Sequence, residues 1–293
     1  MDNAFTFVAS EQGALQKTLK TFTSSPHTKI KQWIATQKVS VNGVVIDKGG
    51  FIVKSGDTIE YNPERAKPKR KPFITIVHQD DSIVVVDKPP GLLSVPYPGL
   101  SEESCLDAIR RVWKHQGYTR VRRPIFVVHR IDKDTSGLLS FALTKHAERS
   151  LSEQLRDHSM QRIYRAWVHG NMKEQRIQSQ LVKNRGDGYR GSTKDPTRGK
   201  RAVSMFKPLE HRSQKTLMEV SLETGRTHQI RIHAAESGHP IVGEKVYIKD
   251  FESNNHTPIP SQRLMLQAVR LKMTHPKTGQ TTEFKSTRDW LNE

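Results

Sequence analysis

Asp132 is the residue of this 293-residue chain whose type and position are best suited to do chemistry. It lies in residues 127–139, which begin with β-branched residues typical of a strand and continue as the turn-forming run Asp-Lys-Asp-Thr-Ser-Gly. We therefore expect Asp132 where a buried strand gives way to a loop, a position at which a packed scaffold fixes the backbone while the loop faces a substrate. A carboxylate there could attack as a nucleophile or take up a proton.

Two simpler interpretations of the same acidic turn stay open. Asp132 and Asp134 could be solvated turn residues, with Asp134 bonding the turn backbone and Arg130 pairing with either one. They could also hold a metal ion, but hard cations need several oxygen ligands, and no further carboxylate cluster lies nearby in the sequence. Taken without their context, the residues favour the solvated turn.

The composition indicates a polyanionic partner. The chain carries 48 lysine and arginine residues against 30 acids, a formal net charge of +18, which favours nucleic acid or an anionic membrane surface. Apolar runs of about 18 residues are absent, and the first residues lack the pattern of a signal peptide, so we expect neither membrane insertion nor secretion. Cys105 is the single cysteine, which excludes an intramolecular disulfide and a cysteine-rich zinc site and suits the cytoplasm.

Residues 28–61 are typical of a small module made of a helix and a hairpin. Apolar residues at helical spacing predict an amphipathic helix over residues 28–38, whose polar face carries Lys29 and Lys31. The Asn-Gly pair at positions 42–43, between two valine-rich runs, predicts a tight hairpin. A further short strand is expected after the Gly-Asp pair that follows.

Residues 64–72 separate this module from the rest of the chain. They contain five basic residues, one acid and two prolines, with nothing apolar beyond an alanine. Such a segment cannot pack a core, and it predicts an extended, charged linker. We therefore place a small domain at residues 1–63 and a large domain at residues 73–293.

The large domain is predicted to contain strands that lead into polar loops. Residues 73–77 and 83–86 predict two strands, and the second ends before a pair of prolines, which a central strand cannot contain. Residues 145–157 predict a helix with one buried stripe, because apolar residues recur at a spacing of four. The alternation in residues 161–168 predicts a further strand.

Residues 224–233 predict another strand, which carries a second group of polar side chains. Its alternation places two isoleucines in the core and Arg231 on the opposite face. His228 and His233 differ by an odd number of positions, so they would face opposite sides of a strand. A metal ion shared by these two histidines is therefore not expected.

Several motifs resemble those of the RluA family of pseudouridine synthases. The sequence His-Arg-Ile-Asp ending at Asp132 resembles the family's signature, and Gly-Arg-Thr-His-Gln-Ile-Arg, ending at Arg231, matches its motif letter for letter. Lys88 begins a Lys-Pro-x-Gly motif, and Tyr164 belongs to a Lys-x-Tyr-x-Ala motif in which Arg162 replaces the usual lysine. The helix-plus-hairpin module resembles the small RNA-binding domain shared with a ribosomal small-subunit protein.

The resemblance implies an α+β fold with a mixed, largely antiparallel central sheet, preceded by the small helix-plus-hairpin domain. It implies an isomerase that rejoins uracil to its ribose through carbon 5, acting on structured RNA, more on large-subunit ribosomal RNA than on transfer RNA. The implied reaction needs no cofactor or metal, and the sequence contains no nucleotide-binding glycine motif. We expect a monomer that binds RNA and no membrane.

The resemblance also implies roles for individual residues. Asp132 would be the catalytic carboxylate, Arg231 would pair with it, and Tyr164 would stack on the target base. One further arginine would fill the gap that the flipped base leaves in the RNA, since a guanidinium plane can stack there. The residues expected to contact RNA are Arg130, which would fill that gap, Lys88, Arg226, Lys29 and Lys31.

Two other classes of protein would share this basic charge. An RNA-binding assembly factor could keep the fold without turnover, but the trio of Asp132, Tyr164 and Arg231 argues against it. A metal-dependent nuclease would also be basic and rich in histidine, and the opposite faces expected for His228 and His233 argue against that class. A chelator would inhibit only the nuclease, and the other two classes would leave the length of the RNA unchanged.

Overall fold

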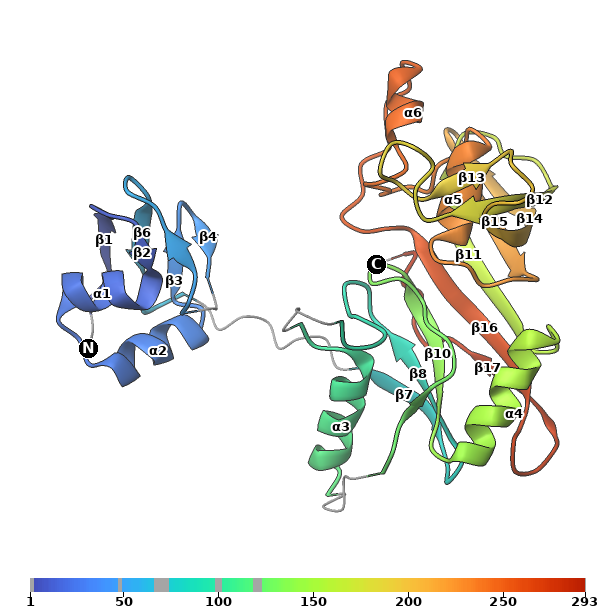
Figure 1. The fold of residues 1–293 in the computed structure, drawn as a ribbon, viewed down its shortest axis with the longest axis horizontal. Helices are drawn as coiled ribbons and strands as arrows, with labels where there is room; N and C mark the ends of the chain where they lie inside the picture. The colour runs from blue at the N-terminus through green and yellow to red at the C-terminus, as the bar shows by residue number, and fades with distance from the viewer. Residues whose placement is uncertain (1–2, 47–48, 66–73, 98–101, 118–122, 293) are drawn as a thin grey trace. The chain divides into compact units, whose positions relative to one another are not determined.

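A computed structural model describes residues 3–46, 49–65, 74–97, 102–117 and 123–292. Contacts within the chain divide it into two compact units, Met1–Pro72 and Phe73–Glu293 (Figure 1). Residues 66–72, most of the expected linker, lie outside the described residues, whereas Arg65 belongs to the N-terminal unit, where it forms an ion pair with Glu60. None of the described helices is long and apolar enough to cross a membrane.

The N-terminal unit combines two helices with a small antiparallel sheet (Figure 1). In spatial order, the sheet consists of β1 (Phe5–Val8), β6 (Thr58–Tyr61), β3 (Val39–Val41) and β4 (Val44–Val45). A two-stranded sheet and two helices complete the unit: β2 (Gly13–Ala14), β5 (Ile52–Val53), α1 (Leu15–Thr23) and α2 (His27–Ala35). Buried side chains from both helices and from β3, β5 and β6 form one hydrophobic core.

The predicted helix and hairpin of this unit are both present. α2 ends at Ala35, three residues before the predicted end, and the chain reverses at Gln37, whose φ of 58° is left-handed. The hairpin turns at Asn42 and Gly43 with φ of 49° and 76°, the positive values that a two-residue type I′ turn requires. β1 and α1 were not predicted, and they add an outer strand and a second helix to the module.

An eleven-stranded sheet is the framework of the C-terminal unit. Its main path runs β13-β12-β14-β15-β11-β16-β10-β8-β7, with β17 beside β16 and β9 beside β10. The bounds are β7 (Thr75–Gln79), β8 (Ile83–Lys88), β9 (Phe126–Val127), β10 (Ser136–Ala142), β11 (Gln161–His169), β12 (Gln175–Val182), β13 (Gly191–Thr193), β14 (Lys200–Arg212), β15 (Lys215–Leu222), β16 (Leu266–Thr274) and β17 (Thr281–Lys285). β10 and β16 run parallel, and the other described strand pairs of this sheet are antiparallel. The expected mixed, largely antiparallel sheet is thereby confirmed.

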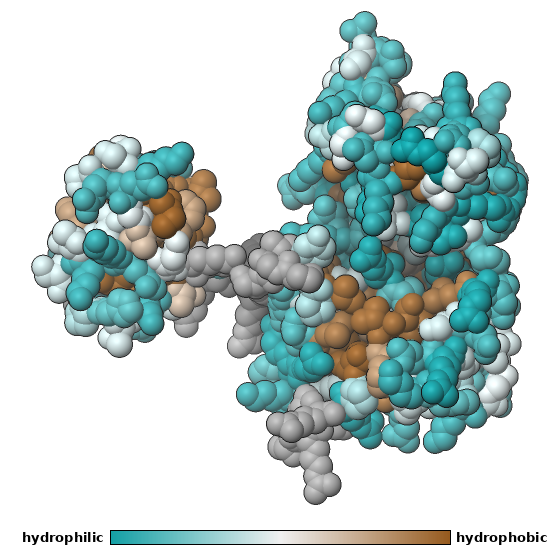
Figure 2. Space-filling model, viewed as in Figure 1, coloured by the Kyte–Doolittle hydropathy of each residue, from teal (hydrophilic) through white to brown (hydrophobic). Residues whose placement is uncertain are grey.

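The described helices of this unit are α3 (Cys105–His115), α4 (Lys145–Arg156), α5 (Gln229–Glu236) and α6 (Lys249–Ser253). α4 begins where it was predicted, because the Thr144 hydroxyl accepts a hydrogen bond from the backbone N–H of Ala147 and so caps the helix. In the view of Figure 1, β8 and β10 run between α3 and α4. Most of the surface visible in Figure 2 is hydrophilic, as the high charge requires, with apolar residues gathered between these two helices.

The prediction of a strand over residues 224–233 is wrong, because this segment is a loop followed by α5. His228 immediately precedes the helix with a left-handed φ of 58°, and the first six residues of α5 are buried. The alternation was misleading because the polar residues Gln229, Arg231 and His233 are buried too, and each has hydrogen-bond partners inside the protein. A period of two indicates a strand only where the polar positions face water.

Candidate active site

A cavity of about 590 Å³ lies beside the loop that carries Asp132. Its walls come from that loop, the C-terminal part of α4, the start of β11 and the loop before α5. Asp132 is the one acid among the described residues that line it. The arginines that line it are Arg130, Arg156, Arg162, Arg226 and Arg231. The cavity is therefore strongly positive around a single carboxylate.

Asp132 lies within a loop, residues 128–135, and not at the end of a buried strand as predicted. β9 is only two residues long and, among the described strands, pairs with β10 alone, and Val127 is 42 % exposed. The β-branched pair at the start of the motif therefore does not form a core strand. The side chain of Asp132 is 22 % exposed, which leaves it accessible from the cavity.

Hydrogen bonds on both sides of Asp132 fix the backbone of this loop. Before it, the Ser94 hydroxyl donates to the carbonyl of Ile131 at 2.6 Å. After it, the carbonyl of Lys133 accepts from the backbone N–H of Gly91 at 2.9 Å. The loop is thereby attached to the segment that follows β8, and the position of the carboxylate follows from that attachment.

Lys88, which was expected to contact RNA, does not reach the surface of the protein. Its side chain is fully buried, and Nζ donates to the carbonyls of Pro89, Leu92 and Lys133 at 3.1, 2.8 and 2.7 Å. Burial lowers the pKa of Lys88 to about 8, against the opposing effect of nearby acids. Since an ammonium has three N–H groups and all three meet carbonyls, none is left for a phosphate. Lys88 is a structural residue that holds the loop of Asp132.

Arg231 reaches Asp132 from α5, but its closer partner is Glu244. Nη1 of Arg231 lies 3.7 Å from Oδ2 of Asp132, whereas Nε and Nη2 donate to Glu244 at 2.8 and 2.7 Å. Glu244 also accepts the backbone N–H groups of Lys245 and Val246. The two parallel bonds to Glu244 fix the plane of the guanidinium and so direct Nη1 toward Asp132.

The pair of Arg231 and Glu244 is charged although it is buried. Burial alone would raise the pKa of Glu244, but the hydrogen bond and charge of Arg231 outweigh it, so this pKa lies below its ordinary value. The pKa of Arg231 is raised, because the bonds to Glu244 outweigh the opposing effect of burial. Glu244 was not predicted: it lies 13 residues from Arg231 in a loop without periodicity, and no local pattern joins the two.

His228 makes a second approach to Asp132, and its other ring nitrogen is hydrogen-bonded to Tyr247. Nε2 of His228 lies 3.9 Å from Oδ1 of Asp132, and its Nδ1 lies 2.7 Å from the hydroxyl of Tyr247. Burial lowers the pKa of His228 more than the charge of Asp132 raises it, so the ring is neutral at pH 7. The guanidinium of Arg231 lies over the Tyr247 ring, 5.3 Å from its centroid. Neither residue had been assigned to the site from the sequence.

Tyr164 lines the cavity from β11. Its side chain is 6 % exposed, and burial raises the pKa of the phenol, so Tyr164 is neutral at pH 7. The pairing of β11 with β16 shifts register between Ile163 and Tyr164, a local irregularity of the kind that redirects side chains near active sites. An aromatic ring in this wall offers a flat apolar surface to a base.

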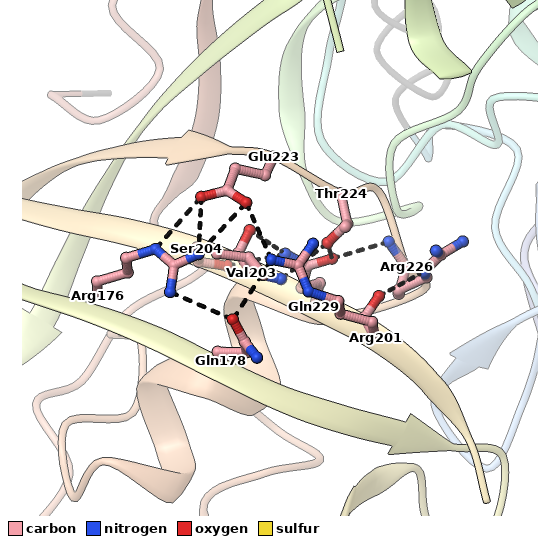
Figure 3. A network of polar contacts seen from close by, with 9 residues as sticks. All are labelled: Arg176, Gln178, Arg201, Val203, Ser204, Glu223, Thr224, Arg226 and Gln229. Atoms are coloured by element: carbon pink, nitrogen blue, oxygen red, sulfur yellow. Dashed lines mark hydrogen bonds and ion pairs between the residues drawn. The ribbon is translucent and has the colours of Figure 1, made fainter. Parts of the chain in front are cut away.

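Gln229 fastens the loop before α5 to the central sheet (Figure 3). Its Oε1 accepts from the Thr224 hydroxyl at 2.7 Å and from the backbone N–H of Arg226 at 3.0 Å. Its Nε2 donates to the carbonyl of Val203 and to the hydroxyl of Ser204, both at 2.9 Å. Because all four bonds come from one buried side chain, this glutamine sets the path of the loop that presents Arg226 and His228 to the cavity.

Arg130 and Arg226 are exposed residues of the cavity lining. Arg130 Nη2 donates to the Thr227 hydroxyl at 3.3 Å, and Arg226 Nε donates to the carbonyl of Arg201 at 3.0 Å. The described residues form no ion pair with either arginine, so both guanidinium groups keep N–H donors for a phosphate.

Lys29 and Lys31, the other residues expected to contact RNA, lie on α2 of the N-terminal unit. Lys31 is exposed, whereas Lys29 is half-buried, with Nζ 5.7 Å from the centroid of the Trp33 ring. Both place positive charge on the surface of their own unit.

One group in the described part of the chain has a spacing suited to a metal ion: His78, Asp80 and His275. Oδ2 of Asp80 lies 2.9 and 2.8 Å from Nε2 of the two histidines, and Oδ1 accepts the backbone N–H groups of Ser82 and Ile83. Nδ1 of His275 accepts the backbone N–H groups of residues 277 and 278, which places the ring proton on Nε2. Hydrogen bonds therefore satisfy this group without a metal, and it does not line the cavity.

His228 and His233 do not share a site, although not for the reason expected of a strand. His228 faces Asp132, whereas His233 lies within α5 and bonds to the hydroxyls of Ser204 and Ser179. Burial lowers the pKa of His233 to about 4, so it is neutral at pH 7. Its role is to join α5 to β12 and β14.

Most of this chain is similar in sequence to known pseudouridine synthases. A family model described as RNA pseudouridylate synthase matches residues 82–236, and a model of the S4 domain matches residues 15–59. The ribosomal large subunit pseudouridine synthase D of Vibrio cholerae is 31 % identical over 290 residues, covering 92 % of this chain and 85 % of that protein. The dual-specificity RNA pseudouridine synthase RluA of Haemophilus influenzae is 36 % identical over 235 residues, covering 79 % and 99 %.

A solved structure agrees at the level of the fold. Human RNA pseudouridylate synthase domain containing 1 superposes with a TM-score of 0.59 at 22 % identity, covering 75 % of this chain and 86 % of that one. The family model spans the segments that carry Asp132, Tyr164 and Arg231. The chain therefore belongs to the RNA pseudouridylate synthases, which are isomerases, and it carries an S4 domain ahead of its synthase domain.

Proposed function

We propose that this protein isomerises specific uridines of structured RNA to pseudouridine with Asp132 as the catalytic carboxylate. The observation that carries the proposal is the cavity in which Asp132 is the one acid among the described lining residues, with Arg231 Nη1 at 3.7 Å and Tyr164 in the wall. A guanidinium at this distance stabilises a negative charge on the carboxylate, the form that can attack or take a proton.

The chemistry requires the site to hold a detached base. The bond from C1′ to N1 breaks, a bond from C1′ to C5 forms, C5 loses a proton and N1 gains one, so neither water nor an oxidant is consumed. Tyr164 offers a ring face against which uracil can turn without leaving. His228 is neutral, so it leaves the negative charge of the Asp132 carboxylate, 3.9 Å away, uncancelled.

A uracil in structured RNA must leave its stack before it can enter this cavity. Arg130 is exposed, and its one described side-chain bond, to Thr227, is long at 3.3 Å, so it can move into the gap left in the RNA. Arg226, also exposed, can bind a phosphate of the same strand.

We propose large-subunit ribosomal RNA as the substrate, in preference to transfer RNA. The Vibrio cholerae relative is named for the large ribosomal subunit, and it aligns over 92 % of this chain, including the N-terminal unit. Lys29 and Lys31 on α2 offer that unit a second set of phosphate contacts. A second tethered contact raises affinity for a large RNA through effective concentration.

The proposal is tested by mapping pseudouridines in RNA from cells with and without the gene. We expect pseudouridine to disappear at one or more large-subunit positions, and to return with the wild-type protein but not with Asp132→Asn. Asp134→Asn is the matched control, because Asp134 is an exposed residue of the same loop and does not line the cavity. Loss of pseudouridines from transfer RNA alone would contradict the proposed substrate. Full restoration of the pseudouridines by Asp132→Asn would contradict the proposed catalytic role of Asp132.

A further inference from the structure

We propose that Arg162 binds a phosphate of the RNA adjacent to the uridine that enters the cavity, a role that rests on the proposed function. Arg162 lies two residues before Tyr164 on β11, and both side chains line the cavity. Arg165, on the same strand, lines a different depression on the other face of the sheet. Alternation along the strand therefore directs Arg162, but not Arg165, toward the substrate.

Arg162 has no anionic partner among the residues that the structure describes. Its Nε is buried and meets no acceptor there, whereas the buried guanidinium of Arg231 is bound by Glu244. A buried donor without an acceptor is unfavourable and rare in folded proteins. An anion that enters the cavity would supply the missing acceptor.

The loop before α5 is shaped to admit the guanidinium of Arg162. A Cβ atom at Gly225 would lie 2.5 Å from Nη1 of Arg162, so the absence of a side chain at position 225 leaves the space that the guanidinium occupies. Gln229 holds the adjoining residues of this loop, Thr224 and Arg226, against the sheet. The guanidinium of Arg162 therefore lies against Gly225, within the lining of the cavity.

Neighbouring side chains do not neutralise the charge of Arg162. His129 also lines the cavity, and burial, reinforced by the charge of Arg162, lowers the pKa of His129 to about 3, so its ring is neutral. Its Nε2 accepts the backbone N–H of Ser140 at 3.1 Å. The wall formed by Arg162, His129 and Tyr164 therefore presents one full positive charge and no negative one.

A phosphodiester is the ligand chemistry that fits this wall. A uridine in the cavity brings a phosphate on each side of its ribose, and a guanidinium binds phosphate oxygens through two parallel N–H bonds. Base edges and hydroxyl groups are neutral and would leave the charge uncompensated. Arg130, Arg156 and Arg226 are exposed, whereas Arg162 is half-buried, so its contact is expected to form only after the nucleotide has flipped.

A double-mutant cycle between protein and RNA tests the inference. The substrate is a synthetic hairpin that contains the uridine mapped for the proposed function, with a neutral methylphosphonate in place of the phosphate on its 5′ or 3′ side. Single-turnover conversion, with protein in excess over RNA but below the concentration that saturates binding, is compared for the wild type, Arg162→Met and Arg165→Met. We expect a methylphosphonate on one side to slow the wild type by about 10- to 100-fold, the range for a hydrogen bond to a charged group.

Arg162→Met should be slower by a similar factor on unmodified RNA and should show no additional slowing on that methylphosphonate. Arg165→Met should respond as the wild type does. Arg162→Lys keeps the positive charge but lacks the planar guanidinium. Its conversion rate should therefore lie between those of the wild type and Arg162→Met, and it should still be slowed by the methylphosphonate. If Arg162→Met is unstable, as a lowered unfolding temperature would show, the lysine variant carries the comparison.

The inference is overturned if Arg162→Met is slowed by the 5′ and by the 3′ methylphosphonate as much as the wild type is. It is also overturned if neither methylphosphonate slows the wild type. Either result would leave the proposed function intact, because the wild type would still convert unmodified RNA. Failure of the wild type to convert any RNA would instead refute the proposed function, and the inference with it.

Discussion

Replacing Glu244 with glutamine removes the charge that holds Arg231 while keeping the shape of the side chain. The two side chains are 0 % and 8 % exposed, and they share two hydrogen bonds of 2.8 and 2.7 Å. The substitution leaves a buried arginine opposite a neutral amide, which can accept only one of the two bonds. Arg231 is then free to turn away from Asp132, whose Oδ2 lies 3.7 Å from Nη1 of Arg231 in the wild type.

The size of the effect follows from the burial of the pair. Removing one partner of a buried ion pair costs about 3 to 5 kcal/mol of stability, and since glutamine keeps one acceptor we expect about 3 kcal/mol. In a unit of this size that corresponds to a fall of about 6 to 12 °C in unfolding temperature. Conversion of bound RNA should slow by about 100-fold, because small displacements of a positioned group have effects of that order.

The loss of stability should also depend on pH with a defined sign. The pKa of Glu244 in the folded protein lies below its ordinary value of 4.5, so its contribution is fully present above the pKa of the unfolded chain. That contribution disappears as the pH falls through the lower, folded pKa. The gap in stability between the wild type and Glu244→Gln should therefore be constant near neutral pH and should shrink below about pH 4.5.

The assay is thermal unfolding across this pH range, with single-turnover conversion at saturating protein. Glu219→Gln is the matched control, because Glu219 pairs with Arg270 at 2.9 Å but the two side chains are 28 % and 40 % exposed. An exposed pair contributes about 1 kcal/mol at most, so this variant should unfold within about 4 °C of the wild type. The reasoning is refuted if Glu244→Gln matches Glu219→Gln in both unfolding temperature and rate.

Three further outcomes are expected. Arg231→Met should slow single-turnover conversion far more than it weakens RNA binding, since Asp132 is then without its cation while the phosphate contacts elsewhere remain; equal effects on rate and binding would contradict this role. As the pH rises from about 8 to about 10.5, the wild type should become more stable relative to Lys88→Met, because Lys88 in the unfolded chain keeps a proton that the buried lysine releases. The measurement is the unfolding temperature of both proteins across this pH range. A constant difference between the two temperatures would exclude such burial. Deletion of residues 1–72 should leave a folded unit that converts short RNA but binds long RNA more weakly. Its log affinity should depend less steeply on log salt, by roughly 0.7 to 0.9 for each phosphate that the N-terminal unit binds in the full chain, and equal slopes would show that this unit does not bind RNA.

Local chemistry in the sequence was sufficient for several elements. The hairpin at Asn42 and Gly43 was predictable because these residues tolerate the positive φ that the turn needs, whatever packs around it. α4 was predictable because one face of the helix is buried and the other is not, and β11 because its first half alternates, with Tyr164 and Ala166 buried and Arg165 exposed. The charge that indicates a polyanionic partner, either nucleic acid or an anionic membrane surface, is likewise a property of composition alone.

The candidate site was only partly accessible from the sequence. The motifs that end at Asp132 and Arg231 indicated that these residues belong together, and the structure places Nη1 of the arginine 3.7 Å from the carboxylate. The strand assigned to the second motif was wrong, because periodicity reports which residues are buried only when polar residues stay outside. In α5 the polar residues are buried with partners from β14 and from the loop of Glu244.

Tertiary structure alone decided which charged groups line the cavity and which are buried as structural supports. Lys88 and Arg162 look alike in a sequence, as basic residues at or near the ends of strands. The packing of β8 against the loop of Asp132 surrounds the Lys88 ammonium with three carbonyls, whereas the cavity leaves Arg162 without an acidic partner among the described residues. Glu244 could not be found for the same reason: the free energy of a charge depends on neighbours that are distant in the chain, and the sequence orders residues by chain position and not by distance in space.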